Sequence, residues 1–114
     1  MRKWVVVLAA LMVAAGVQAA ELEISHCKYP EAPAVPDGTT ATEAEMGQSG
    51  ADVRQFVADI ESSLECLLAV EESLGEDITE EQQATLVAIY NNGVDQMNTV
   101  VTDYNQQVAA FRGE

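Results

Sequence analysis

Residues 79–111 read TEEQQATLVAIYNNGVDQMNTVVTDYNQQVAAF, and apolar side chains recur through this stretch in alternating steps of three and four. The recurring residues are Val87, Tyr90, Val94, Met97, Val101, Tyr104, Val108 and Phe111. This is the a/d repeat of a helix that packs in a coiled-coil-like manner. Thr79 and Gln82 have the spacing of an N-terminal capping box. We therefore expect a helix over about 80–112.

A second amphipathic helix is predicted upstream, over about 42–74. Its apolar residues recur in steps of three, four or seven: Val53, Val57, Ile60, Leu64, Leu67 and Leu74. Thr42 and Glu45 form a further capping box, and Gly75 is a suitable C-terminal cap. The low helix propensity of the first turns, which contain two glycines, leaves a start near Ala51 open. Only a short connection separates the two helices, so they must run antiparallel.

A proline-rich strap, residues 21–40, precedes the helical segment 41–114. Pro30, Pro33 and Pro36 recur every third residue, which favours an extended chain. Asp37-Gly38 is a turn signal, so the strap can reverse there and run back along the helices. On lengths alone, an extended chain of ~3.3 Å per residue reaches from the first helix turn back to Cys66.

The chain has two cysteines, Cys27 and Cys66, and a disulfide between them is expected in an exported protein. An intermolecular pair is the alternative. The fold class predicted from these elements is all-α: an antiparallel two-helix hairpin with an extended proline-rich N-terminal strap tied down by the disulfide.

The first twenty residues, MRKWVVVLAALMVAAGVQAA, have the pattern of a secretory signal peptide. Arg2 and Lys3 precede a short apolar run, and small residues follow at the cleavage region. The run is too short for a stable membrane span. We therefore expect export to the periplasm, with no membrane insertion after cleavage.

Cleavage would remove two of the five basic residues and leave three against 19 acidic ones, a net charge of −16. Such a chain is repelled by nucleic-acid phosphates and by anionic lipid, so we expect neither as a partner.

No catalytic residues, cofactor or metal are predicted. The sequence contains no P-loop, dinucleotide fingerprint, Cys-x-x-Cys or HExxH motif, and a lone His26 beside a paired cysteine is a poor zinc site. We therefore expect a protein that is not an enzyme.

Two surfaces are candidates for binding. The first is the a/d repeat of residues 87–111, as an interaction face for a protein partner or a second copy. Phe56, Leu68, Leu86 and Ile89 fall off its centre and suggest a second apolar face, suited to a dimer.

The second candidate is an acidic patch at the hairpin tip, for a calcium-type cation or a basic partner. Its residues are Glu71, Glu72, Glu76, Asp77, Glu80 and Glu81.

The strap also carries the pattern C-x2-P-x2-P-x2-P-D-G over Cys27–Gly38, followed by Glu45-Met46 and Cys66-Leu67. In this it resembles a group of small exported proteobacterial proteins with no assigned activity. The resemblance covers Cys27 to about Leu68, and Phe56 stands where that group suggests tyrosine. It implies a periplasmic location and a disulfide, and it implies no reaction.

Overall fold

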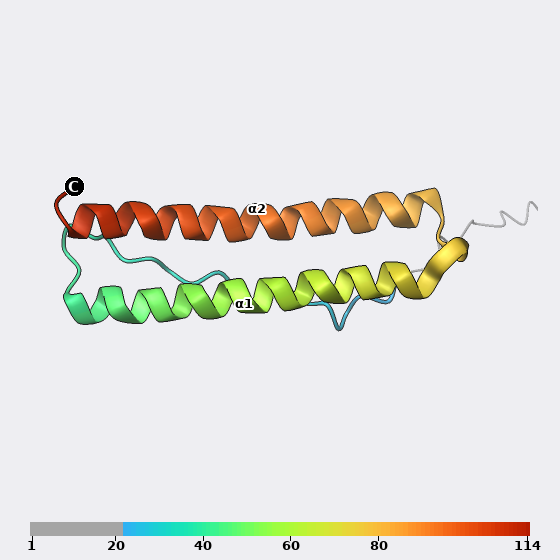
Figure 1. The fold of residues 1–114 in the computed structure, drawn as a ribbon, viewed down its shortest axis with the longest axis horizontal. Helices are drawn as coiled ribbons and strands as arrows, with labels where there is room; N and C mark the ends of the chain where they lie inside the picture. The colour runs from blue at the N-terminus through green and yellow to red at the C-terminus, as the bar shows by residue number, and fades with distance from the viewer. Residues whose placement is uncertain (1–21) are drawn as a thin grey trace, which may run out of the picture.

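The computed structural model describes residues 22–114, and the predicted signal peptide lies outside this range. Two long helices, α1 (Glu43–Leu74) and α2 (Glu80–Phe111), run antiparallel and are joined by one short 3-10 turn, η1 (Gly75–Asp77) (Figure 1). The described residues contain no strand. The all-α hairpin predicted from the sequence is therefore confirmed.

The helix ends follow from local chemistry. Thr42 caps α1, because its hydroxyl accepts a hydrogen bond from the Glu45 amide, so the helix begins at Glu43 and not near Ala51. Gly75 ends α1 with a φ of 51°, a conformation that favours glycine, and its amide donates to the last-turn carbonyls. Thr79 forms the full capping box of α2 with Gln82.

The strap, residues 22–42, reverses the chain before α1 and runs behind the two helices in the view of Figure 1. At its turn, the Asp37 carbonyl accepts from the amides of Thr40 and Ala41. The Gly38 amide donates to Gln107 Oε1 at 2.8 Å, and a Cβ at Gly38 would lie 1.9 Å from the Gln107 carbonyl oxygen. Only glycine lets the strap approach α2 this closely.

The core lies between the helices and under the strap. It is formed by Cys27, Val53, Phe56, Ile60, Leu64, Leu67, Val70, Leu86 and Val100. Tyr29 and Val35 of the strap pack against it. Phe56 and Leu86 are each only 3% exposed, and Ile89 packs against this core. The predicted second apolar face is therefore wrong for Phe56 and Leu86, which are buried; Ile89 is half-buried and Leu68 is exposed.

The centre of the packing face of α2 also differs from the prediction. The predicted a/d repeat placed Val87, Val94 and Val101 at this centre, but the buried positions lie one residue earlier, at Leu86, Gly93 and Val100. The buried face is shifted because α2 packs against both α1 and the strap. The strap reaches α2 at Ile89, Gly93 and Gln107, which turns the buried face of the helix toward it.

Gly93 has low helix propensity in the middle of α2, yet it forms a contact that a larger residue would block. A Cβ at Gly93 would lie 2.4 Å from Tyr29 Oη. We predict that Gly93→Ala lowers the free energy of unfolding by about 1–2 kcal/mol, because overpacking outweighs the gain in helix propensity. Gly47, with open space around it, is the control, and Gly47→Ala should stabilise by roughly 0.5–1 kcal/mol.

Urea unfolding measures both effects. In a Tyr29→Ala background the penalty of Gly93→Ala should disappear, since the clashing ring is gone. A penalty that persists there would contradict the contact.

The buried hydroxyl of Ser49 makes no hydrogen bond, although the residue is only 4% exposed. We predict that Ser49→Ala stabilises the protein by about 1 kcal/mol, because an unpaired buried polar group is removed and helix propensity improves. Thermal melting should show an increase of several degrees. Exposed Ser62→Ala is the control and should give only a few tenths of a kcal/mol. A lower melting temperature for Ser49→Ala would mean that the hydroxyl is paired in solution.

Candidate interaction surface

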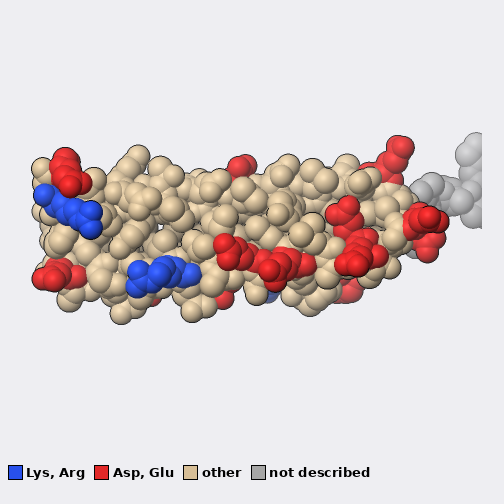
Figure 2. All heavy atoms as spheres, in the orientation of Figure 1, with Lys and Arg blue, Asp and Glu red and all other residues tan. Residues whose placement is uncertain are grey.

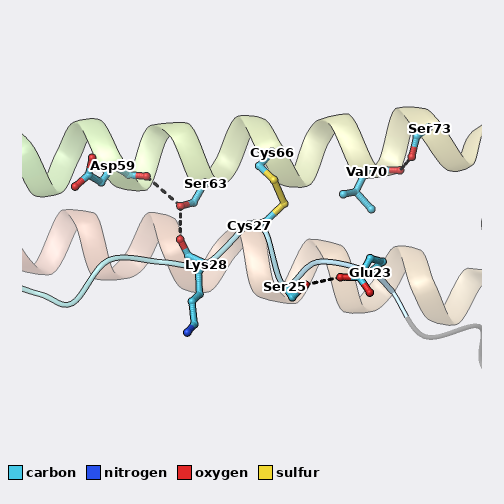
Figure 3. The surroundings of a disulfide bond; sticks show 9 residues. All are labelled: Glu23, Ser25, Cys27, Lys28, Asp59, Ser63, Cys66, Val70 and Ser73. Atoms are coloured by element: carbon cyan, nitrogen blue, oxygen red, sulfur yellow. Dashed lines mark hydrogen bonds between the residues drawn. A yellow bond between two sulfur atoms is a disulfide. The ribbon is translucent and has the colours of Figure 1, made fainter.

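The two flanks of the helix pair differ, because the strap covers only one of them. On the covered flank, Cys27 of the strap is joined to Cys66 of α1, with their Cα atoms 5.4 Å apart (Figure 3). The predicted intramolecular disulfide is therefore confirmed. Next to it, Ser63 Oγ lies 2.8 Å from the Lys28 carbonyl oxygen and 3.0 Å from the Asp59 carbonyl oxygen, and its single proton is shared between these two acceptors.

Tyr29 attaches the strap to the second helix. Its hydroxyl donates to the Ile89 carbonyl at 2.5 Å, and its ring lies against Gly93. The strap is thus bonded to α1 through the disulfide and to α2 through Tyr29, so it bridges the helices along this flank.

The opposite flank is open and apolar. Here a groove of about 240 Å³ lies between α1 and α2, and no strap residue lines it. We call it the free-flank groove; its lining residues are Leu67, Leu68, Glu71, Leu86, Val87, Tyr90 and Asn91. Leu68 is 51% exposed and Val87 49% exposed, so two large apolar side chains on facing helices contact water.

The predicted interaction face is divided by this arrangement. Val87 and Tyr90 line the free-flank groove, whereas Val94, Met97, Val101 and Tyr104 are half-buried against the core. Val108 is half-buried and Phe111 is exposed at the far end of α2. The off-centre position of Leu68 predicted a second apolar face, but the periodicity did not pair Leu68 with Val87.

The one charged residue that lines the free-flank groove is acidic. Between Arg54 and Arg112 the sequence contains eleven Asp and Glu residues and no Lys or Arg. In Figure 2, which has the orientation of Figure 1, acidic side chains gather over the half of the molecule nearer η1, and Lys and Arg lie mainly over the other half. Glu71 itself lines the groove. The open apolar surface therefore lies in an acidic part of the chain, with the Glu71 carboxylate on its wall.

The predicted acidic tip patch is spread over three elements: the end of α1, η1 and the start of α2. Its carboxylates do not converge on a point, since the one group of three potential metal ligands within residues 22–114 is His26, Cys27 and Cys66. Both cysteines of that group are in the disulfide. Among residues 22–114, no three carboxylates of the tip thus lie within 4.8 Å of one another.

Two ionisable groups of the strap have shifted pKa values. Burial raises the pKa of Tyr29 above its ordinary value, and the neighbouring Gly93 amide opposes this shift in part. Hydrogen bonds from the Thr39 hydroxyl and amide lower the pKa of Asp37, which favours the charged carboxylate in the turn.

Within residues 22–114, neither helix has an apolar stretch long enough to cross a bilayer. Comparisons with protein-family models, with curated proteins and with solved structures find no match to this chain.

The raised pKa of Tyr29 predicts a loss of stability in alkali. Because the folded state holds the phenol proton more tightly, the contribution is complete below the unfolded pKa of 10.0 and is lost as pH rises through the higher folded pKa. Tyr29→Phe should lower the free energy of unfolding by about 1 kcal/mol at neutral pH, through loss of the bond to Ile89.

The same variant should then lose less stability than the parent protein between neutral pH and pH above 10. Urea unfolding at the two pH values measures the difference. Identical pH dependence in both proteins would contradict a partly buried, hydrogen-bonded phenol.

Proposed function

We propose that this chain is a non-catalytic, exported interaction module that binds another protein through the free-flank groove. The observation on which this rests is the half-exposure of Leu68 and Val87 on facing helices, beside a groove that the chain's own strap does not cover. Exposed apolar patches on soluble proteins mark interaction sites more often than single exposed residues do. The alternative occupant is a second copy of the same chain.

Export to the periplasm is part of this proposal. The N-terminal signal-peptide pattern supports it, and so does a disulfide that ties the strap to α1, because such bonds persist in oxidising compartments. A non-catalytic role is supported by the lack of any recognisable catalytic motif in the sequence.

Site-specific photo-crosslinking in the producing cells tests the proposal. We expect a photoreactive benzoylphenylalanine at Val87 to form one dominant adduct, because this side chain lies at the edge of the groove. The same residue at Glu31, which is exposed on the strap, is the matched control and should form none. An adduct of a different protein identifies the partner, and an adduct of twice the chain mass identifies self-association. Equal adducts at both positions, or none at either, would contradict the proposal.

A further inference from the structure

The size of the free-flank groove indicates the kind of occupant it takes. Its volume of about 240 Å³ is below the roughly 300–1,000 Å³ of typical small-molecule pockets. It is an open furrow between two helices, with Leu68 on one wall and Val87 on the other. A surface of this kind accommodates a few side chains projecting from a larger partner.

The lining residues favour a helix over an extended chain. On the covered flank, Gly38 and Gly93 give the room in which the extended strap reaches α2. The free-flank groove is lined instead by leucine, valine and tyrosine, with no glycine. Side chains of this kind, in a furrow between antiparallel helices, match the apolar ridge of a third helix.

The acidic residues of this chain favour a partner with positive charge. The eleven acidic residues between Arg54 and Arg112 have no basic residue in the same segment to pair with. A second copy would bring an identical set of carboxylates toward the groove, and like charges across an interface oppose binding. Lysine or arginine flanking an apolar ridge would pair with Glu71, on the groove wall, and with its acidic neighbours.

We propose that the free-flank groove binds a cationic amphipathic helix of another protein, with leucine-like side chains in the groove and Lys or Arg side chains against Glu71 on the groove wall. This assignment rests on the proposed function and specifies the chemistry of its partner. Leu68 and Val87 contact the apolar ridge of the bound helix, and Glu71 contacts a basic side chain beside it.

The probe is a synthetic Leu/Lys amphipathic helix of about five turns (roughly 18 residues). Its binding to the oxidised protein, purified from the periplasm of cells that express the full chain, is followed by fluorescence anisotropy. A scrambled peptide of the same composition tests amphipathicity, and a Leu/Glu peptide tests the sign of the charge. We expect saturable binding of the Leu/Lys helix alone, weakened by added salt.

Matched variants locate the site. Leu68→Ser and Val87→Ser should each weaken binding by about tenfold, as expected for a central apolar contact. Glu71→Gln should weaken it by about threefold. The controls are Phe111→Ser, an exposed apolar residue at the far end of α2, and Glu31→Gln on the strap; both should bind normally. Because Leu68 and Val87 are half-exposed, the variants should melt like the parent protein.

Equal binding of the scrambled peptide would reduce the interaction to charge attraction and overturn the proposal. Absence of binding, or unchanged affinity in Leu68→Ser and Val87→Ser, would overturn it as well. The Leu/Lys helix could fail to bind while Val87 crosslinks to another protein. That result would support the proposed protein-binding function and overturn the assignment of a cationic helix as the partner. If Val87 crosslinks only to a second copy, the groove is a dimer interface and this proposal is wrong.

Discussion

The covalent bond between Cys27 and Cys66 determines where the strap lies, and most of the structure depends on that placement. Two helices alone bury only the residues between them, which is little for a chain of this size. The strap adds a third body to the core and is fixed at both ends, by the disulfide to α1 and by the Gly38–Gln107 contact to α2. On a chain-entropy model, closing a loop across a sequence separation of 39 contributes about 4 kcal/mol.

The strap covers one flank of the helix pair and leaves the other flank open. This asymmetry connects the fold to the proposed function. The strap turns the buried face of α2 toward Leu86, Gly93 and Val100, so Val87 is left at the edge of the helix contact. Leu68 of α1 is left at the facing edge. The exposed apolar surface is thus a consequence of how the core was completed, and the acidic residues of this part of the chain limit which partners can approach.

Periodicity and capping chemistry predicted the elements well, because these signals are local. Thr42, Gly75 and Thr79 set the helix ends, and Asp37-Gly38 reverses the strap as its turn chemistry indicates. The rotation of α2 about its own axis could not be predicted, because it depends on where the strap residue Tyr29 contacts this helix. Gly93 has low helix propensity, and the close approach of the Tyr29 ring explains why a glycine occupies this position. Pairing Leu68 with Val87 requires the relative register of the two helices, which no local pattern contains.

The strap covers one flank of the helix pair, and the other flank stays open. Methyl NMR of the isolated oxidised protein with a soluble nitroxide tests this most directly, because the probe broadens only methyl groups that contact solvent. We expect strong broadening of Leu68 and Val87, which are about half exposed, and protection of Leu86 and Val100, which are 3% and 8% exposed. Protection of Leu68 and Val87, or equal broadening of all four residues, would contradict this arrangement.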